Sequence, residues 1–461
     1  MYCPPRPRPL PALLSLVRAA SEGDGNLLNL LPDYAYRAPL AWLGYSRRSI
    51  LIVNDPPEVA RVLANADGLF PKSDLMVGAL EPLVGESMFV SEGKTWSRQR
   101  KMIDPAFSHM RLTAAFEAMS TAVDAYERRL NEAAQTRTPV SLDLAMSHLT
   151  ADIICRTVFT TSLESHVARE VFEDFAIFER SVAEVEIRRL IVDPAWTRVP
   201  QKADVLEACQ RIRAHLGDLL APHLSVDGET ASDAYDDIAT ALVKARAAGD
   251  GRPFTRKELL DQLGVFFLAG HETTASVLTW VFFIVATQPA IAERMREEIH
   301  GVVGSGPVTF EHTKKLPFLR AVFRETLRLY PPITFLPRVA AGPTRIGRFR
   351  VRRGALIMIS PWTIHRNPAN WPDPDAFDPD RFMDGRDRDA PDYAYIPFGK
   401  GPRICIGAGF ATVESALILA RLIRAFDFEV IDPAAVKPVA RLTTRPKDQI
   451  MARVTRRSGA G

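Results

Sequence analysis

Cysteine is scarce in this chain of 461 residues, which contains only Cys3, Cys155, Cys209 and Cys405. The four lie far apart and form no C-x-x-C pair. The sequence therefore disfavours both a disulfide framework and a zinc site, and it fits a reducing compartment. The remaining composition, 47% apolar and 25% charged, is that of an ordinary globular protein. It excludes a disulfide-stapled mini-protein, a collagen-like chain and a disordered chain.

An excess of either charge is also missing. The 58 Lys and Arg residues are balanced by 55 Asp and Glu residues, for a formal net charge of +3. A nucleic-acid-binding domain is typically strongly basic, so we expect no nucleic-acid partner. No internal repeat and no Gly/Ser linker divides the chain. Length alone suggests about three domains of roughly 150 residues each, although large single folds break that rule.

A membrane-spanning segment is lacking as well. The N-terminal lead, residues 1–20, is rich in proline, and its short apolar stretch can neither span a bilayer nor act as a signal peptide. The only long apolar segment, Leu263 to Thr287, carries His271 and Glu272 in its middle, where a charged group would be costly in lipid. We therefore expect a buried helix in a soluble, cytoplasmic protein whose first 20 residues form a flexible lead.

Helical patterns dominate the middle of the chain. Apolar residues recur at helical spacing in three long stretches, Met110–Ala134, Leu206–Leu220 and Thr255–Gln288. The third stretch begins with a capping box, Thr255 and Glu258, and stops just before Pro289. At 1.5 Å per residue this helix would be about 50 Å long. A helix so long and so apolar belongs in the centre of a mainly helical fold.

Strand-like patterns are few and short. They occur at Ser49–Asn54, Arg348–Val351 and Ala355–Ile359, and the Arg-Arg-Gly turn at 352–354 predicts a hairpin between the last two. Two further helices are expected at Phe318–Tyr330 and Ile406–Phe426. The predicted fold class is mainly α with a minor β portion.

One cysteine lies in a glycine-rich loop, Phe398 to Gly407, that runs directly into the last predicted helix. The positive end of the helix dipole would lower the pKa of the Cys405 thiol and favour the thiolate. A thiolate in such a loop can serve as a nucleophile or as a metal ligand. No histidine is recognisably placed as its base, which disfavours a cysteine protease. An inert, buried cysteine is the remaining alternative.

The second motif, Ala269-Gly-His-Glu-Thr-Thr274, lies midway along the long apolar helix. Glycine costs about 1 kcal/mol inside a helix, which suggests a close approach to the backbone at Gly270. The Thr273 hydroxyl can bond the carbonyl of Ala269 and loosen the helix there. An acid, Glu272, beside this alcohol could relay protons into a dry pocket. The alternative is a core helix whose polar residues find partners elsewhere.

Two further spacings place a pair of polar or charged groups on one helix face. Glu325 and Arg328 stand at i, i+3 and can bond directly, although an exposed ion pair is the commoner outcome of that spacing. Trp96 and Arg100 stand at i, i+4, where their N–H groups could hold a carboxylate. A basic surface helix with a half-buried tryptophan is the more frequent result of this pattern.

Taken in order, these motifs resemble those of the cytochrome P-450 family, the haem-thiolate monooxygenases, in its soluble bacterial-type members. The matching pieces span residues 96–407 and are Trp96/Arg100, the Ala269–Thr274 helix, Glu325-x-x-Arg328, Phe377-Asp-Pro-Asp-Arg381-Phe382 and the Phe398–Gly407 loop. The resemblance implies one large haem domain over residues 1–461, mainly helical, with the long central helix crossing over the haem.

The resemblance also implies a b-type haem, iron protoporphyrin IX, with Cys405 as the axial ligand of its iron. Four residues match positions that bind the haem propionates: Trp96, Arg100, Arg338 and Arg403. Guanidinium groups suit that task because they meet carboxylates bidentately and stay charged. Three more would lie against the sulfur or form the oxygen groove: Phe398, Ala269 and Gly270.

By the same resemblance, Thr273 and Glu272 would be the catalytic residues. Thr273 would hold activated dioxygen in the groove, and Glu272 would help to deliver protons for O–O cleavage. The expected reaction converts R–H, O2, two electrons and two protons into R–OH and water. A structural triad would support the fold rather than catalysis, and its members would be Glu325, Arg328 and Arg381.

The expected substrate is lipophilic, because the candidate pocket residues are apolar. They are Met88, Phe89, Phe266, Ile333, Phe335 and Leu442, under a mobile lid at 172–198. No flavin or ferredoxin module is visible, so we expect a separate ferredoxin or flavodoxin with its NAD(P)H reductase. Such a partner could dock on a basic face made of Lys94, Arg98, Lys101, Lys400, Arg421 and Arg424.

Two alternatives stay open at this point. A haem-thiolate peroxygenase, isomerase or dehydratase would need no reductase, although such relatives often lack the acid–alcohol pair seen at Glu272 and Thr273. A haem-based sensor would bind the cofactor without turnover.

Overall fold

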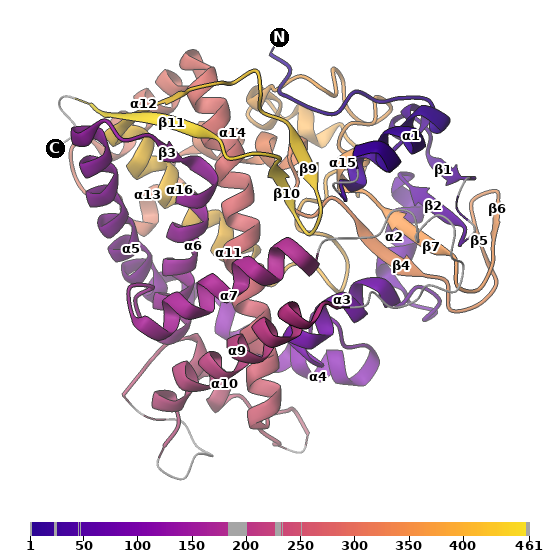
Figure 1. Cartoon of the computed structure of the whole chain (residues 1–461), viewed down its shortest axis with the longest axis horizontal. Coiled ribbons are helices and arrows are strands. Elements are labelled where there is room, and N and C mark those ends of the chain that lie inside the picture. The colour runs from indigo at the N-terminus through magenta and orange to yellow at the C-terminus, as the bar shows by residue number, and fades with distance from the viewer. Residues whose placement is uncertain are drawn as a thin grey trace.

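The structure, a computed structural model, describes the whole chain except residues 1, 23–24, 45, 47, 183–200, 226–231, 233, 250 and 458–461. The predicted fold class is confirmed, because helices build most of the molecule (Figure 1). They are α1 Ala12–Glu22, α2 Pro56–Ala64, α3 Asp74–Val84, α4 Gly93–Ile103, α5 His109–Thr136, α6 Leu142–Phe159, α7 His166–Val182, α9 Ala203–Leu220, α10 Ile238–Lys244, α11 Arg256–Thr287, α12 Pro289–Val303, α13 Phe310–Lys314, α14 Pro317–Leu329, α15 Pro361–Ile364 and α16 Ala408–Ala425.

The strands form four small sheets. They are β1 Leu40–Leu43, β2 Ile50–Val53, β3 Val140–Ser141, β4 Leu336–Val339, β5 Thr344–Ile346, β6 Phe349–Val351, β7 Leu356–Ile359, β8 Phe426–Val430, β9 Pro438–Ala440, β10 Thr444–Pro446 and β11 Met451–Arg456. The largest has the order β1-β2-β7-β4, with β2 and β7 parallel from Ile50 opposite Leu356. It lies at the right of Figure 1, beside the helical body.

The hairpin predicted at 352–354 is wrong. Strand β6 pairs with β5, from Thr344 opposite Val351 to Ile346 opposite Phe349, so the hairpin turn lies one strand earlier. Strand β7 instead enters the larger sheet, where β2 bonds one of its edges and β4 the other. Because both edges of β7 are occupied, it has no edge left for β6. The turn at Gly354, which has φ +82°, only redirects the chain.

The central helix α11 begins and ends as its sequence predicts. Thr255 and Glu258 form the capping box, and the helix stops at Thr287, before Pro289. Length and composition would allow α11 to cross a membrane, but 83% of its most apolar stretch is buried inside the fold. It is therefore a core helix of this fold. The cytoplasmic location stays a prediction.

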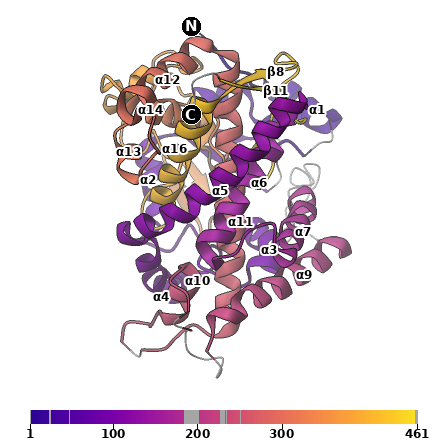
Figure 2. The same cartoon turned by 90° about the vertical axis from the view of Figure 1, so that its left-hand side faces the viewer.

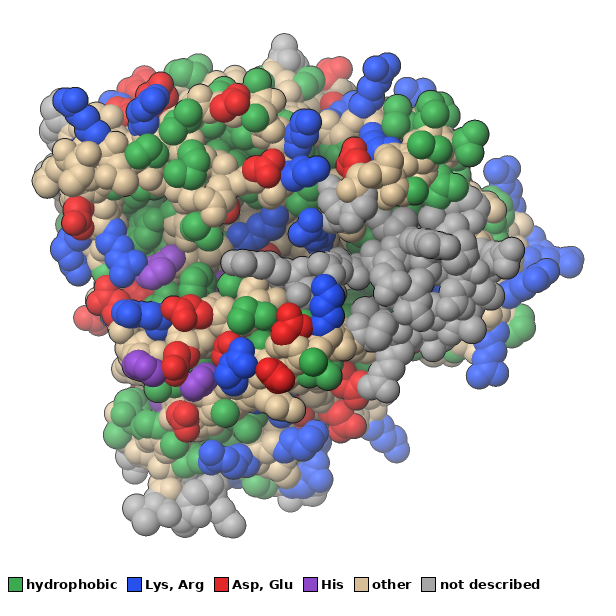
Figure 3. All heavy atoms as spheres, in the orientation of Figure 1, with side chains coloured by type: hydrophobic (Ala, Val, Ile, Leu, Met, Phe, Trp, Pro, Cys, Tyr) green, Lys and Arg blue, Asp and Glu red, His purple; other side chains and the backbone are tan. Residues whose placement is uncertain are grey.

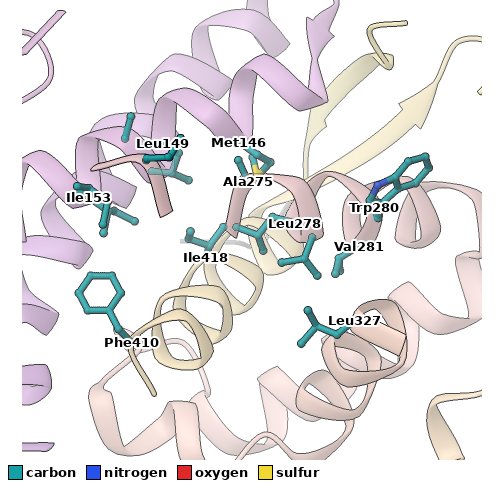
Figure 4. Close-up of a cluster of buried hydrophobic side chains, with 14 of the residues drawn as sticks. Met146, Leu149, Ile153, Ala275, Leu278, Trp280, Val281, Leu327, Phe410 and Ile418 are labelled. Atoms are coloured by element: carbon teal, nitrogen blue, oxygen red, sulfur yellow. The ribbon is translucent and has the colours of Figure 1, made fainter. Parts of the chain in front are cut away.

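Helices α6, α14 and α16 enclose α11 (Figure 2). Their apolar side chains point toward one another in the cluster of Figure 4, in which Met146, Leu149 and Ile153 come from α6, Ala275, Leu278 and Val281 from α11, Leu327 from α14, and Phe410 and Ile418 from α16. Acidic and basic side chains intermingle on the molecular face of Figure 3. This mixture agrees with the small net charge.

The N-terminal lead lies against the core over its first residues. The Tyr330 hydroxyl donates to the carbonyl of Pro5 at 2.6 Å, and the amide of Phe377 donates to the carbonyl of Tyr2 at 2.9 Å. Arg6 pairs with Asp375 at 2.6 Å. These contacts tie the start of the chain to the end of α14 and to the loop that follows α15.

The three residues of the predicted triad meet in the interior. Arg328 donates to both carboxylate oxygens of Glu325 at 2.7 Å, and Arg381 donates to one of them at 3.2 Å. All three side chains are at most 2% exposed. Arg328 also donates to the carbonyls of His365, Pro374 and Ala376. The triad thus ties α14 to the irregular segment that precedes the cysteine loop.

We predict that Glu325→Gln lowers the free energy of unfolding by roughly 3–5 kcal/mol, because it leaves two buried guanidinium groups without their anion. Urea unfolding followed by circular dichroism measures the loss. Glu311→Gln is the control, since Glu311 pairs with Lys314 on the surface, and it should leave the midpoint unchanged. An unchanged midpoint for Glu325→Gln would show that the triad does not stabilise the fold.

Candidate active site

A single cavity of about 450 Å³ joins the middle of α11 to the cysteine loop. Its volume lies within the usual range for small-molecule sites. It is lined by every predicted catalytic, cofactor-binding and pocket residue: Met88, Phe89, Trp96, Arg100, Phe266, Ala269, Gly270, Glu272, Thr273, Ile333, Phe335, Arg338, Phe398, Arg403, Cys405 and Leu442. The structure therefore brings together residues that are more than 350 positions apart in the sequence.

The cysteine loop is folded by its glycines and by one backbone bond. The amide of Cys405 donates to the carbonyl of Phe398 at 2.9 Å and closes the loop. Gly399 and Gly401 have φ values of +69° and +78°, a region that favours glycine. Helix α16 begins directly after Gly407. The loop thus presents the Cys405 sulfur to the cavity at the N-terminal end of a helix.

The pKa of the Cys405 thiol differs from the sequence-based prediction. Burial raises it, and the backbone amide of Gly407 and the Arg100 guanidinium only partly oppose that effect. The predicted lowering was wrong because desolvation outweighs the helix end. The side chain is nevertheless exposed to the interior of the cavity. A metal bound there would displace the thiol proton, since the thiolate is the ligand form.

Cationic side chains converge on one end of the cavity. Lys72, Arg338 and Arg403 repel one another, and burial together with Arg403 lowers the pKa of Arg338 to about 10. Burial lowers the pKa of Lys72 and Arg403 as well. The Arg403 guanidinium donates to Glu92 at 2.5 Å, yet its buried Nη1 finds no partner among the described residues. An anion with two carboxylates, such as haem, fits this end of the cavity.

Trp96 and Arg100 complete this cationic end from helix α4. The Arg403 guanidinium lies 4.6 Å from the centre of the Trp96 ring. Arg100 donates to the carbonyl of Ile404 at 2.7 Å and to Asp104 at 2.7 Å. Sequence reasoning missed Lys72, because no motif surrounds it. It reaches the cavity through an isolated backbone bridge to Arg338.

On the side of α11, the cavity is lined by Thr273 and Gly270. The Thr273 hydroxyl donates to the carbonyl of Ala269 at 2.7 Å, as its spacing predicted. Gly270 packs closely against α6, because a Cβ there would lie 2.4 Å from Cδ1 of Ile154 and would force that side chain to move. The close approach predicted at this glycine is therefore made by a neighbouring helix, while Gly270 also lines the cavity.

Glu272 is buried in an ion pair that sequence reasoning missed. Arg445 of β10 donates to its carboxylate through Nε at 2.8 Å and through Nη2, and the Thr443 hydroxyl donates at 2.5 Å. Arg445 also donates to Ser147 of α6 at 2.9 Å. No sequence pattern marks these partners, because β10 is three residues long and far from α11 in the chain. Glu272 is therefore held as a carboxylate at the cavity wall.

Helix α7 forms the described part of the predicted lid. Phe175 stacks on Phe267 of α11 with ring centres 4.6 Å apart, and Phe172 contacts the His271 ring at 6.1 Å. Residues 183–198 of the predicted lid lie outside the described residues. The described part of the lid is thus seated on α11 by aromatic contacts.

Comparison with known proteins places this geometry in a family. The Cytochrome P450 family model matches residues 4–452. The chain is 30% identical over 432 residues to Protein LUTEIN DEFICIENT 5 of Arabidopsis thaliana, covering 90% of this chain and 72% of that protein. It is 30% identical over 373 residues to the cyclooctat-9-en-7-ol 5-monooxygenase of Streptomyces melanosporofaciens, covering 79% and 77%.

Solved structures show the same fold. The crystal structure of the cytochrome P450DA haem domain superimposes with a TM-score of 0.79 at 21% identity, over 91% of this chain and 90% of that one. The family model covers nearly the whole sequence, including the cysteine loop and the central helix that the cavity joins. The chain belongs to the cytochrome P450 family.

Proposed function

We propose that this cytochrome P450 monooxygenase inserts one atom of O2 into a lipophilic organic substrate, by hydroxylation or epoxidation, with electrons from a separate redox partner. One observation carries the proposal. The Cys405 sulfur, the cationic end of the cavity and the Thr273 side chain line the same cavity, whose other walls are mostly apolar. This arrangement suits a thiolate-ligated haem next to an apolar substrate.

The cofactor would be held at two places. Cys405 would ligate the iron, and the propionates would meet the cationic side chains, which are Lys72, Arg100, Arg338 and Arg403, with Trp96 beside them. When bound, the haem supplies O2 binding and O–O cleavage, which electron donation from a thiolate favours. The propionates would satisfy the buried Nη1 of Arg403 and reduce the repulsion among the cations.

Residues of α11 would manage protons at the cavity wall. The Thr273 hydroxyl, anchored on the carbonyl of Ala269, can accept a hydrogen bond from water and pass a proton toward the cavity. Glu272 offers a carboxylate one residue away, and Arg445 fixes its orientation. The surrounding apolar side chains limit the water that reaches these groups, so that protons travel only through placed polar atoms.

A lipophilic substrate fits the remaining wall. The predicted pocket side chains form it, with Phe107 packed edge-on against Phe266 at 5.2 Å. This wall is built by helices α3, α4 and α11, by strand β4 and by the loops beside them. The Streptomyces relative is named for monooxygenation of cyclooctat-9-en-7-ol. We therefore propose a mainly hydrocarbon substrate that is held by shape.

Electrons would come from a ferredoxin or flavodoxin served by an NAD(P)H reductase. Four residues of the predicted basic face already have other partners: Arg98 pairs with Glu258, Lys400 with Asp392, and Arg421 with Asp124 and Glu127, while Arg424 donates to two carbonyls. Lys94 and Lys101 of α4 are exposed. These two lysines, on the helix that also carries Trp96, are the cations we propose for docking.

Turnover under ¹⁸O2 tests the proposed reaction. Purified protein is given a surrogate ferredoxin, its reductase, NADPH and a panel of hydrocarbon-rich compounds. We predict that one ¹⁸O atom enters each product molecule, because a monooxygenase sends the other atom of O2 into water. Mass spectrometry detects the label. Product that carries oxygen from water, or equal turnover with peroxide and no reductase, would contradict the proposal.

The role of Thr273 can be separated from helix stability. Thr273→Ala should lower the product formed per NADPH consumed roughly ten-fold and raise peroxide release, because a positioned proton donor is lost. Thr279→Ala is the matched control, since Thr279 makes the same bond to the carbonyl four residues back, at 2.8 Å, outside the cavity lining. Equal coupling in Thr273→Ala and wild type would overturn the assignment.

A further inference from the structure

A histidine and two acids form a cluster of which the proposed reaction uses only one member, Glu272. Nε2 of His271 lies 3.2 Å from Oε1 of Glu179, and one side-chain atom from each of His271, Glu179 and Glu272 lies within 4.8 Å of the others. The His271 side chain is 2% exposed, whereas that of Glu179 on α7 is 21% exposed. The cluster therefore runs from the part-exposed lid helix to the cavity wall.

The ring of His271 has one nitrogen anchored and the other turned toward Glu179. Nδ1 lies 2.7 Å from the carbonyl oxygen of Phe267, which can only accept, so Nδ1 carries a proton. Nε2 lies 3.2 Å from Oε1 of Glu179 without meeting hydrogen-bond geometry. Nε2 is therefore the ring atom that can exchange a proton with Glu179 when that contact closes.

Neighbouring charges favour a proton in this position. Glu272 is paired with Arg445, and burial lowers the pKa of Arg445 while Glu179 and Asp143 oppose the effect. From α6, the Thr150 hydroxyl donates to the carbonyl of His271 at 3.1 Å, and His148 contacts Phe172 at 5.9 Å between ring centres. A divalent metal ion would stand beside the Arg445 cation, so a proton is the better positive charge for the two acids.

We propose that Glu179 and His271 are a proton-supply pair that returns a proton to Glu272 during turnover. This inference rests on the proposed monooxygenase function. A proton from bulk water reaches Glu179 at its exposed side and is held on Nε2 of His271. It then passes to the Glu272 carboxylate, through one water where the gap exceeds hydrogen-bond length. The protons leave the cavity in product water, and uptake at Glu179 restores the starting state.

This assignment explains why an ion-paired acid can serve the cavity. Arg445 and Thr443 stabilise Glu272 as an anion, so Glu272 can transmit protons but holds one poorly. His271, the preceding residue on α11, faces α7 rather than the cavity lining. It can therefore store the proton without occupying substrate space.

Glu179→Gln tests the pair, because it removes the charge and keeps the shape. We expect kcat to fall about ten-fold and its solvent deuterium isotope effect to increase, while the substrate Kd measured by the spin-state shift stays unchanged. Glu170→Gln is the matched control on the same helix, since Glu170 pairs with exposed His166 at 3.2 Å, and it should behave as wild type. A kcat and an isotope effect equal to wild type in Glu179→Gln would overturn the proposal.

A second measurement does not depend on turnover. The chain has nine histidines, so ¹⁵N-histidine NMR of the reduced, CO-bound protein, with His271→Gln for assignment, reports the protons of one ring. We expect the proton occupancy of Nε2 to change in Glu179→Gln while Nδ1 keeps its proton, because Nε2 is the atom that exchanges a proton with Glu179. An Nε2 occupancy that is the same in wild type and Glu179→Gln would overturn the pair. If wild type makes no product at all, the proposed function fails, while this spectrum still shows whether His271 exchanges a proton with Glu179.

Discussion

The close packing of α11 against its neighbours is the constraint on which the site depends. Gly270 lets the Ile154 side chain of α6 approach α11, where an added Cβ would lie 2.4 Å from its Cδ1 and would displace it. With α11 fixed at that contact, its next residues point outward at helical spacing toward different partners. His271 meets Glu179 of α7, Glu272 meets Arg445 of β10, Thr273 lines the cavity, and Thr274 faces Glu414 of α16. One turn of helix therefore connects the lid, the C-terminal strands and the cysteine helix.

The electrostatics of the cavity are unbalanced in a way that a bound cofactor would correct. Three cations repel one another, and a thiol with a raised pKa faces the same cavity. Propionates would neutralise the cations, and an iron centre would stabilise the thiolate. The buried triad at Glu325 shows the opposite case, in which the protein supplies its own compensating charges. The triad residues thus neutralise one another, whereas the cations of the cavity need the carboxylates of a ligand.

Much of this arrangement could be predicted from local sequence patterns. The capping box fixed the start of α11, and the back-bond of Thr273 follows from its spacing. The contacts that escaped prediction join distant segments: Glu272 meets Arg445 from 173 positions away, and Lys72 bridges to Arg338 without a motif. The desolvation of Cys405 could not be predicted from the sequence either, because burial depends on the whole fold. The misplaced hairpin has the same origin, since the partner strands β2 and β4 decide where β7 pairs.

The central claim is that Cys405 provides the thiolate ligand of a haem iron in this cavity. The reduced, CO-bound absorption spectrum of the purified protein tests it most directly, with Cys405→Ser as the comparison. We predict a thiolate-type Soret band for the wild-type protein and the loss of that band in Cys405→Ser, with haem still recovered from a folded chain. A wild-type spectrum without the thiolate-type band, or a variant that keeps it, would contradict Cys405 as the ligand.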